Sequence, residues 1–171
     1  AQAQSLGGTD VSQVEIFEDF QYIVTIINSG NAVNNATFQI TMDEDLQNLA
    51  LTSITSQNNI GGASDAGGFN LSASNVLTGS VNSLPSDSSV EIKIEVTAPS
   101  TVGGIAINAI ISPPDGTTDT NTSNNQSLIS IDVIDVDINF SVTHSQISPA
   151  AGTPIPSWNS PVTYRFTITN N

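Results

Sequence analysis

The sequence contains no cysteine, which excludes disulfide bonds, thiolate metal ligands and thiol nucleophiles. Basic residues are nearly absent too: only Lys93 and Arg165 stand against 16 acidic residues, giving a formal net charge of -14. Such a chain repels phosphate backbones and anionic headgroups, so nucleic acid and membrane surfaces are not expected as partners. No apolar run approaches the roughly 18 residues that cross a bilayer, so no membrane insertion is expected in this segment.

Short segments in which apolar and polar residues alternate are frequent, and they predict β-strands. In Ser89–Thr97 the apolar residues fall on one face of an extended chain and the charged residues on the other. We expect Tyr22, Val24, Ile26, Val90, Ile92, Ile94 and Val96 to be buried, and Glu91, Lys93 and Glu95 to face solvent. Further strands are expected at Gln21–Asn28, Ala36–Met42, Leu49–Ser56, Ser74–Gly79, Gly104–Ile111 and Ser127–Val133. Many short strands with polar turns predict an all-β, immunoglobulin-like antiparallel β-sandwich.

An internal repeat sets the expected domain organisation. The segment Tyr22-Ile-Val-Thr-Ile-Ile-Asn-Ser recurs as Tyr164-Arg-Phe-Thr-Ile-Thr-Asn-Asn, 142 residues later, and Gly8-Thr9 corresponds to Gly152-Thr153. This spacing fits a repeat of whole domains. We therefore predict a tandem repeat: residues 1–135 form one sandwich whose first strand is largely missing, and residues 136–171 form the first strands of a second.

The predicted strands of the second copy raise a question of assembly. Val136–Ser145 alternates like a first strand, whereas almost nothing before Gly7 corresponds to it in the first copy. Either the chain is a window of a longer array, or a neighbouring molecule supplies the missing strand. Two strands alone are marginal in water, so we expect the apolar faces of residues 136–171 to be covered by neighbouring repeats or by other copies of the same protein.

Three motifs, in this order along the chain, resemble a family of bacterial and archaeal cell-surface repeats. They are Tyr22-Ile-Val-Thr-Ile-Ile-Asn-Ser-Gly-Asn-Ala, Leu84-Pro-Ser-Asp-Ser-Ser-Val-Glu-Ile-Lys-Ile and Asp119-Thr-Asn-Thr-Ser-Asn-Asn-Gln-Ser. They resemble the CARDB-like immunoglobulin-like domains and the related conserved repeat of unknown function, number eleven. The resemblance implies a secreted or cell-surface protein, often a stalk, without general enzymatic activity.

Residues with catalytic chemistry are few. His144 is the single histidine and is flanked by Thr143 and Ser145, but a Ser–His pair also needs an orienting group and a shaped site. The acidic run Asp43-Glu44-Asp45 holds paired carboxylates of the type that glycosidases use, although acidic turns on surface repeats are usually solvated. We expect no catalytic residue and no enzymatic activity.

Calcium is the cofactor that the acidic residues suggest, since it takes six to eight oxygen ligands. Three clusters are candidates: Asp115, Asp119 and Asn121 in the turn before the last strand; Asp132, Asp135 and Asp137 at the domain junction; and Asp43-Glu44-Asp45. The alternative for the turn is local, with side chains that accept hydrogen bonds from backbone amides. At the junction, the carboxylates repel one another without a cation.

Two further residues have alternative interpretations. Lys93 could belong to an isopeptide cross-link, but its place between Glu91 and Glu95 favours cross-strand charge pairing. Trp158 could stack on a glycan, or it could cover a sheet edge or domain boundary, which we favour.

Three hypotheses for function follow. The first is a non-catalytic stalk or spacer repeat of a secreted surface adhesin or extracellular filament. The second is a self-polymerising fibre subunit assembled by β-strand addition. The third is a carbohydrate- or protein-binding module that uses the Gly61–Gly68 loop and Trp158 to reach surface glycans or proteins.

Overall fold

The computed structural model describes residues 1–136, 138–155 and 157–170. The chain divides into two compact units, Ala1–Asp135 and Val136–Asn171. Among the described residues, no helix is long and apolar enough to cross a membrane.

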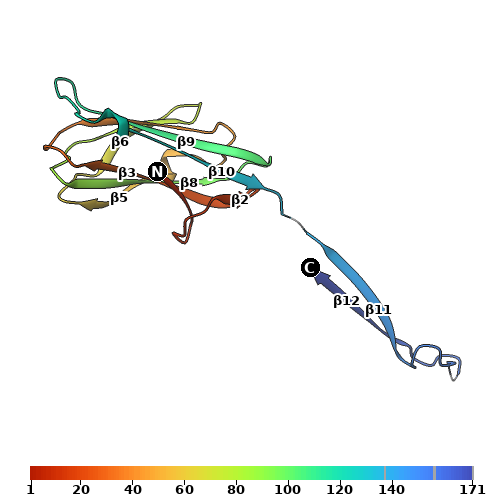
Figure 1. Ribbon diagram of the computed structural model, residues 1–171. Coiled ribbons are helices and arrows are strands. Elements are labelled where there is room, and N and C mark those ends of the chain that lie inside the picture. Colours follow the sequence, from red (N-terminus) through yellow and green to blue (C-terminus); the bar gives the residue numbers. More distant parts are fainter. Residues whose placement is uncertain (137, 156, 171) are drawn as a thin grey trace. The chain divides into compact units, whose positions relative to one another are not determined.

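The first unit is a sandwich of two β-sheets (Figure 1). The four-stranded sheet has the order β1–β3–β8–β5, and its neighbouring strands are antiparallel. Its strands are β1 Gln2–Ser5, β3 Asp19–Asn28, β8 Ser88–Thr97 and β5 Ile54–Ile60. The six-stranded sheet has the order β2–β10–β9–β4–β7–β6. Its strands are β2 Gln13–Glu15, β10 Gln126–Ile134, β9 Gly103–Ser112, β4 Ala36–Met42, β7 Val76–Val81 and β6 Ala66–Leu71.

The first strand of the sandwich is divided between the two sheets. Strand β1 pairs antiparallel with β3, and after a short loop β2 pairs parallel with β10. The remaining neighbours in the six-stranded sheet are antiparallel. Two 3₁₀ turns, η1 (Leu51–Ser53) and η2 (Thr122–Asn124), complete the described elements of this unit.

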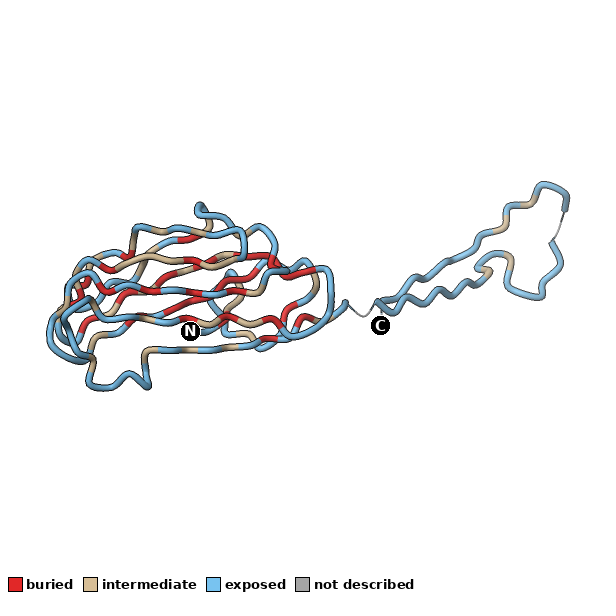
Figure 2. The backbone as a smooth tube through the Cα atoms, turned by 90° about the horizontal axis from the view of Figure 1, so that it is seen from above, coloured by how far each residue is buried: buried red, intermediate tan, exposed pale blue. Residues whose placement is uncertain are grey.

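The core lies between the two sheets and consists of the inward residues of alternating strands (Figure 2). Every residue that the alternation predicted to be buried is at most 5% exposed, which confirms that part of the prediction. The charged face of β8 is half-buried rather than fully exposed. The reason is that β8 is a central strand, so β3 and β5 flank Glu91, Lys93 and Glu95 on both sides.

Three differences from the sequence prediction concern short or glycine-rich segments. A four-residue strand, β1, does precede Gly7, and β2 follows it. The strand expected at Leu49–Ser56 begins only at Ile54, because η1 occupies the preceding residues. Part of the Gly61–Gly68 loop belongs to β6, which pairs with β7 through a bulge between Gly67 and Asn70. Side-chain alternation is weak in these segments, so it does not reveal the strands.

The second unit is a two-stranded antiparallel hairpin of β11 (Phe140–Ser148) and β12 (Thr163–Asn170). Eight residue pairs form its register, with a bulge between Gln146 and Ser148. All described residues of β12 are exposed, and those of β11 are exposed except for the intermediate Gln146 (Figure 2). The hairpin therefore has no core of its own among the described residues.

Candidate interaction surfaces

One face of the β11–β12 hairpin is apolar. Residues directly opposite each other in an antiparallel pair share a face of the sheet. The pairs on this face are Phe140 with Asn170, Val142 with Ile168, His144 with Phe166, and Gln146 with Tyr164. The other face carries Ser141, Thr143, Ser145, Arg165, Thr167 and Thr169. The alternation thus collects most of the hairpin's large apolar side chains on one side.

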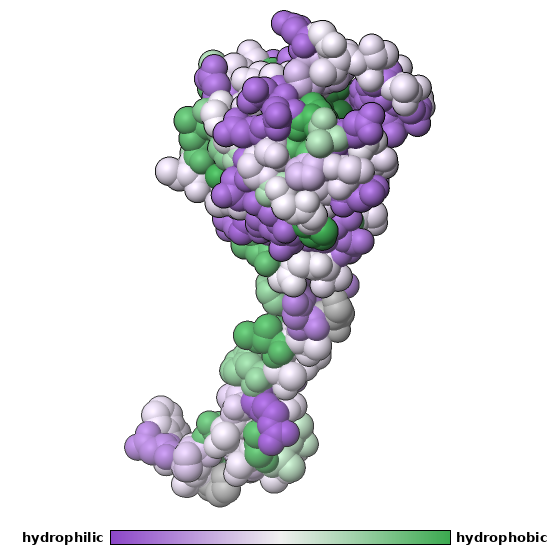
Figure 3. All heavy atoms as spheres, turned by 90° about the vertical axis from the view of Figure 1, so that its left-hand side faces the viewer, coloured by the Kyte–Doolittle hydropathy of each residue, from purple (hydrophilic) through white to green (hydrophobic). Residues whose placement is uncertain are grey.

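These apolar side chains are open to solvent (Figure 3). Phe140, Val142, Phe166 and Ile168 are 66 to 74% exposed, and Tyr164 is 53% exposed. The rings of His144 and Phe166 stack with centroids 6.0 Å apart. An exposed apolar face on a two-stranded sheet is typical of a surface that another sheet or chain covers.

The hairpin repeats the β1–β3 pair of the first unit in its register. Ala3 lies opposite Tyr22, and Gln146 lies opposite Tyr164, the tyrosine that begins the repeated motif. The bulge in β11 adds one residue relative to β1. The turns that follow the two strands contain the equivalent glycines Gly8 and Gly152, whose φ angles are 84° and 82°. The agreement extends the sequence repeat to backbone geometry.

The two pairs differ in length. Strand β1 pairs with residues 20–23 of β3, whereas β11 pairs with β12 as far as Asn170. Among the described residues, no strand pairs with Val24–Asn28 of β3 on the side opposite β8. This part of β3 is an open edge, without proline, charge or bulge to block strand addition.

A turn with the same backbone geometry precedes β3 and β12. In the first unit, Glu18 N–H donates to Glu15 O (3.1 Å), and Phe17 has a φ of 61°. In the second, Ser160 N–H donates to Ser157 O (3.2 Å), and Asn159 has a φ of 67°. A side chain also links the ends of each turn: Glu15 N–H donates to Glu18 Oε2 at 2.7 Å, and the hydroxyls of Ser157 and Ser160 lie 2.9 Å apart.

Trp158 and Ile16 occupy the same position in these two turns, but their surroundings differ. Ile16 is partly buried and packs against the core, and its N–H donates to Ile134 O on β10 at 2.9 Å. Trp158 is 97% exposed. It lines a shallow cavity of about 430 Å³ with Ile155, Ser157, Asn159 and Ser160.

His144 does not form a nucleophilic pair with its sequence neighbours. Alternation along β11 places its ring on the apolar face against Phe166, while Thr143 and Ser145 belong to the opposite face. Of the acidic run, Asp43 Oδ1 accepts a hydrogen bond from Asp45 N–H (3.0 Å), so this side chain stabilises its own turn.

The turn before β10 uses its polar side chains locally. Asn121 N–H donates to Asp119 Oδ1 (2.8 Å), and Ser123 Oγ donates to Asn121 Oδ1 (2.6 Å). Asp115 lies in the same loop, and calcium at this turn stays a prediction. The hydrogen bonds of Asp119 and Asn121 are of the local kind that we gave as the alternative to calcium binding at this turn.

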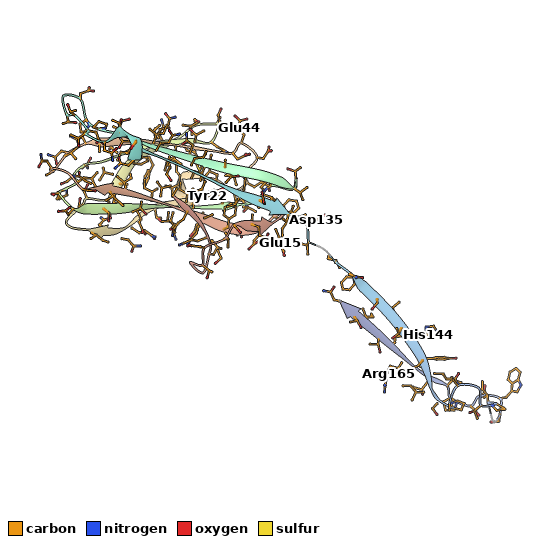
Figure 4. All side chains as sticks on the ribbon, viewed as in Figure 1. Glu15, Tyr22, Glu44, Asp135, His144 and Arg165 are labelled. Carbon is orange, nitrogen blue, oxygen red and sulfur yellow. The ribbon has the colours of Figure 1, made fainter. Side chains whose placement is uncertain are left out.

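The junction carboxylates lie at the end of β10. Asp132 is exposed on this strand, and Asp135 follows it near Glu15 of β2 (Figure 4). Asp137 lies outside the described residues. Within the part of the chain that the structure describes, no three His, Cys, Asp or Glu side chains form a group that could hold a metal ion. Calcium at the junction stays a prediction.

The charge pairing of Lys93 differs from the prediction. Its Nζ lies 2.7 Å from Glu95 Oε1, two residues along the same strand, whereas its cross-strand neighbours are Ile23 and Thr55. The prediction of cross-strand pairing was wrong because strand order places no acidic residue beside Lys93. Glu91 instead accepts hydrogen bonds from side chains on β5, Gln57 and Asn58.

The outer face of the six-stranded sheet carries a shallow depression of about 460 Å³ near Gly68 and Gly79. Its rim is made of uncharged hydroxyl and amide side chains: Thr37, Gln39, Thr78, Ser80 and Ser112. This is where the glycine-rich segment of the third hypothesis lies.

The arrangement of the first unit defines an immunoglobulin-like antiparallel β-sandwich, and comparison with solved structures agrees. The C-terminal domain of the Streptococcus agalactiae AgI/II polypeptide BspA matches at a TM-score of 0.52 and 12% identity, covering 96% of this chain and 59% of that chain. A cohesin module of a Clostridium perfringens family 33 glycoside hydrolase matches at 0.51 and 16%, covering 74% and 93%. At these identities the similarity shows the fold alone.

A CARDB domain from Pyrococcus furiosus also matches, with a TM-score of 0.47 and 14% identity over 72% of this chain and 80% of that chain. At this score the likeness adds nothing to the fold assignment. No protein-family model and no curated protein matches the sequence.

Proposed function

We propose that the protein is a non-catalytic spacer repeat of a secreted bacterial surface adhesin or extracellular filament, related to the CARDB-like repeats that the sequence resembles. The observation that carries this proposal is serial repetition. After the first sandwich, the chain enters a hairpin with the register and turn of β1–β3. A chain that repeats whole sandwiches along its length suits a mechanical spacer, whose partners are the neighbouring repeats.

The pairing of β2 with β10 suits a repeat that carries tension. The two strands are parallel over three residue pairs, and Ile16 N–H and Asp132 N–H add bonds to Ile134 O and Ser12 O. Force that draws the start of β2 and the end of β10 apart acts along both strands, so it shears these bonds together rather than opening them one at a time.

Force spectroscopy of the full chain, held at both ends, tests the spacer role. We expect the first unit to unfold in one step at a force well above that which opens the hairpin. Val14 lies in the middle of the parallel pair and is 2% exposed. Val14→Ala should lower the unfolding force more than Leu128→Ala, an exposed position on the same sheet. A first unit that unfolds at no higher force than the hairpin would contradict a role in carrying tension.

The second candidate is a fibre subunit that assembles by strand addition, and Val24–Asn28 of β3 is the edge at which a strand would add. In this case a strand from another copy of the protein pairs with Val24–Asn28, as Phe140–His144 pairs with β12 within the hairpin. Sedimentation over a wide concentration range tests it. Assembly that Thr25→Pro abolishes and Thr55→Pro leaves intact would support strand addition, since Thr25 lies in the open edge and Thr55 in β5.

A further inference from the structure

We propose that the β11–β12 hairpin is a docking surface for strands that correspond to β4–β10, and that Trp158 then packs against the second core beside a β10-like strand, as Ile16 does in the first unit. The proposal rests on the spacer function and names what completes the second sandwich. The hairpin then is the first edge of an immunoglobulin-like repeat, and its exposed aromatic residue is a packing anchor.

The position of Trp158 carries the first step. The equivalent Ile16 packs against the first core, and its backbone N–H bonds to Ile134 O of β10. Both turns have the same hydrogen bond, the same left-handed third residue and a side-chain link between their ends. Because the two turns are built alike, Trp158 occupies the position at which Ile16 packs against the first core and bonds to β10 through its backbone N–H.

The apolar face carries the second step, because its side chains match those that β3 turns toward its core. Tyr22 and Ile26 correspond to Tyr164 and Ile168, so the side chains at these two positions are identical. Phe20 and Val24 correspond to Val162 and Phe166, so one large and one small residue exchange places. Total volume is kept, which is the kind of core change that proteins tolerate best. A sheet with the pattern of β4–β10 can therefore pack on this face.

The absence of charge on the apolar face of the hairpin also suits the apolar side of another sheet as its occupant. All acidic residues except Asp137 belong to Ala1–Asp135, and the apolar face of the hairpin carries no carboxylate, lysine or arginine. A further difference from the first unit is Gln146 in place of Ala3. Its side-chain amide donates to Pro149 O (2.8 Å), so it already has a partner within the hairpin. The face is suited to a dry apolar contact.

A fusion tests the proposal directly. Residues 29–135 of the same protein are joined after Asn170, since Asn170 corresponds to Asn28 and the strand register is kept. Trp158 is the single tryptophan, so its fluorescence reports on its own surroundings. In the fusion we expect emission at shorter wavelength and severalfold weaker quenching by acrylamide than in the 171-residue chain. Ile168→Asp in the fusion puts a carboxylate on the apolar face and should abolish both changes, whereas Thr167→Asp, on the opposite face of β12, should leave them in place.

Limited proteolysis of the hairpin provides a second measurement. It should show resistance in the fusion and sensitivity in a fusion that carries Trp158→Asp. Equal sensitivity of the two fusions, or a Trp158 as accessible as in the 171-residue chain, would overturn the proposal. Two results with the 171-residue chain would also overturn it. Protection of Trp158 that grows with protein concentration would indicate a second copy as the occupant, and protection that requires an added oligosaccharide would indicate a glycan. None of these results depends on the force at which the first unit unfolds, so the spacer proposal is tested separately by that force.

Discussion

The ring of Phe38 lies over Gly79, its cross-strand partner on β7, in the space where a side chain on residue 79 would have to be. Gly79→Ala should therefore destabilise the first unit by about 1–3 kcal/mol through overpacking. Urea denaturation measures this. Gly67→Ala on β6 is the matched control, because an added Cβ there meets no atom within 4 Å. Equal effects of the two substitutions would mean that Phe38 moves aside without cost.

Phe17 adopts the left-handed backbone conformation, with a φ of 61°, although it is bulky and 58% exposed. That conformation costs a non-glycine residue about 1–2 kcal/mol, and asparagine tolerates it better. The equivalent turn in the second unit has Asn159 there. We expect Phe17→Asn to stabilise the first unit by about 1 kcal/mol. Leu6→Asn, at an exposed position without a positive φ, should give no gain in stability. An equal gain there would mean that replacing an exposed apolar side chain, and not relief of the backbone conformation, causes the effect.

Tyr22 is fully buried between the sheets, and its hydroxyl has no hydrogen-bond partner among the described residues (Figure 4). Burial raises the pKa of Tyr22 well above its ordinary value, and the charge of Asp43 raises it further. Removal of an unpaired buried hydroxyl relieves its desolvation cost, so Tyr22→Phe should be neutral or stabilising by up to about 1 kcal/mol near pH 7.

The raised pKa of Tyr22 also predicts a pH dependence. Above about pH 10 the unfolded tyrosine releases its proton while the folded one keeps it, so the free energy of unfolding falls as pH rises. Tyr22→Phe should remove part of this loss. Urea titrations at pH 8 and near pH 11 measure it. Identical pH dependence in the two proteins would show that Tyr22 ionises as readily in the folded state.

Calcium at the domain junction is a prediction that the sequence makes for Asp132, Asp135 and Asp137. A cation held there adds about 2.7 kcal/mol to the free energy of unfolding at a hundredfold excess over its dissociation constant. Melting curves with calcium and with chelator should then differ, and Asp135→Asn should bring them together while Asp65→Asn does not. Superimposable curves for the unsubstituted protein would remove calcium from the junction.

Several features of the fold could be predicted because they are local. Alternation in Ser89–Thr97 identified the buried side of β8, since successive side chains of an extended chain point to opposite faces. The limits of β4, Ala36–Met42, are those expected from the same pattern. Strand β6 was missed because its glycines hide the alternation, and β2 because three residues show no period.

The sequence by itself determined that the chain folds into strands, which of their faces are apolar, and that Tyr22 and Tyr164 begin equivalent segments. These properties follow from the order of residues along an extended chain. Only the tertiary structure decided that Lys93 pairs with Glu95 along one strand, that β2 joins β10, and that Ile16 is partly buried while Trp158 is exposed. Such facts depend on which strands become neighbours, and residues more than a hundred positions apart decide that together.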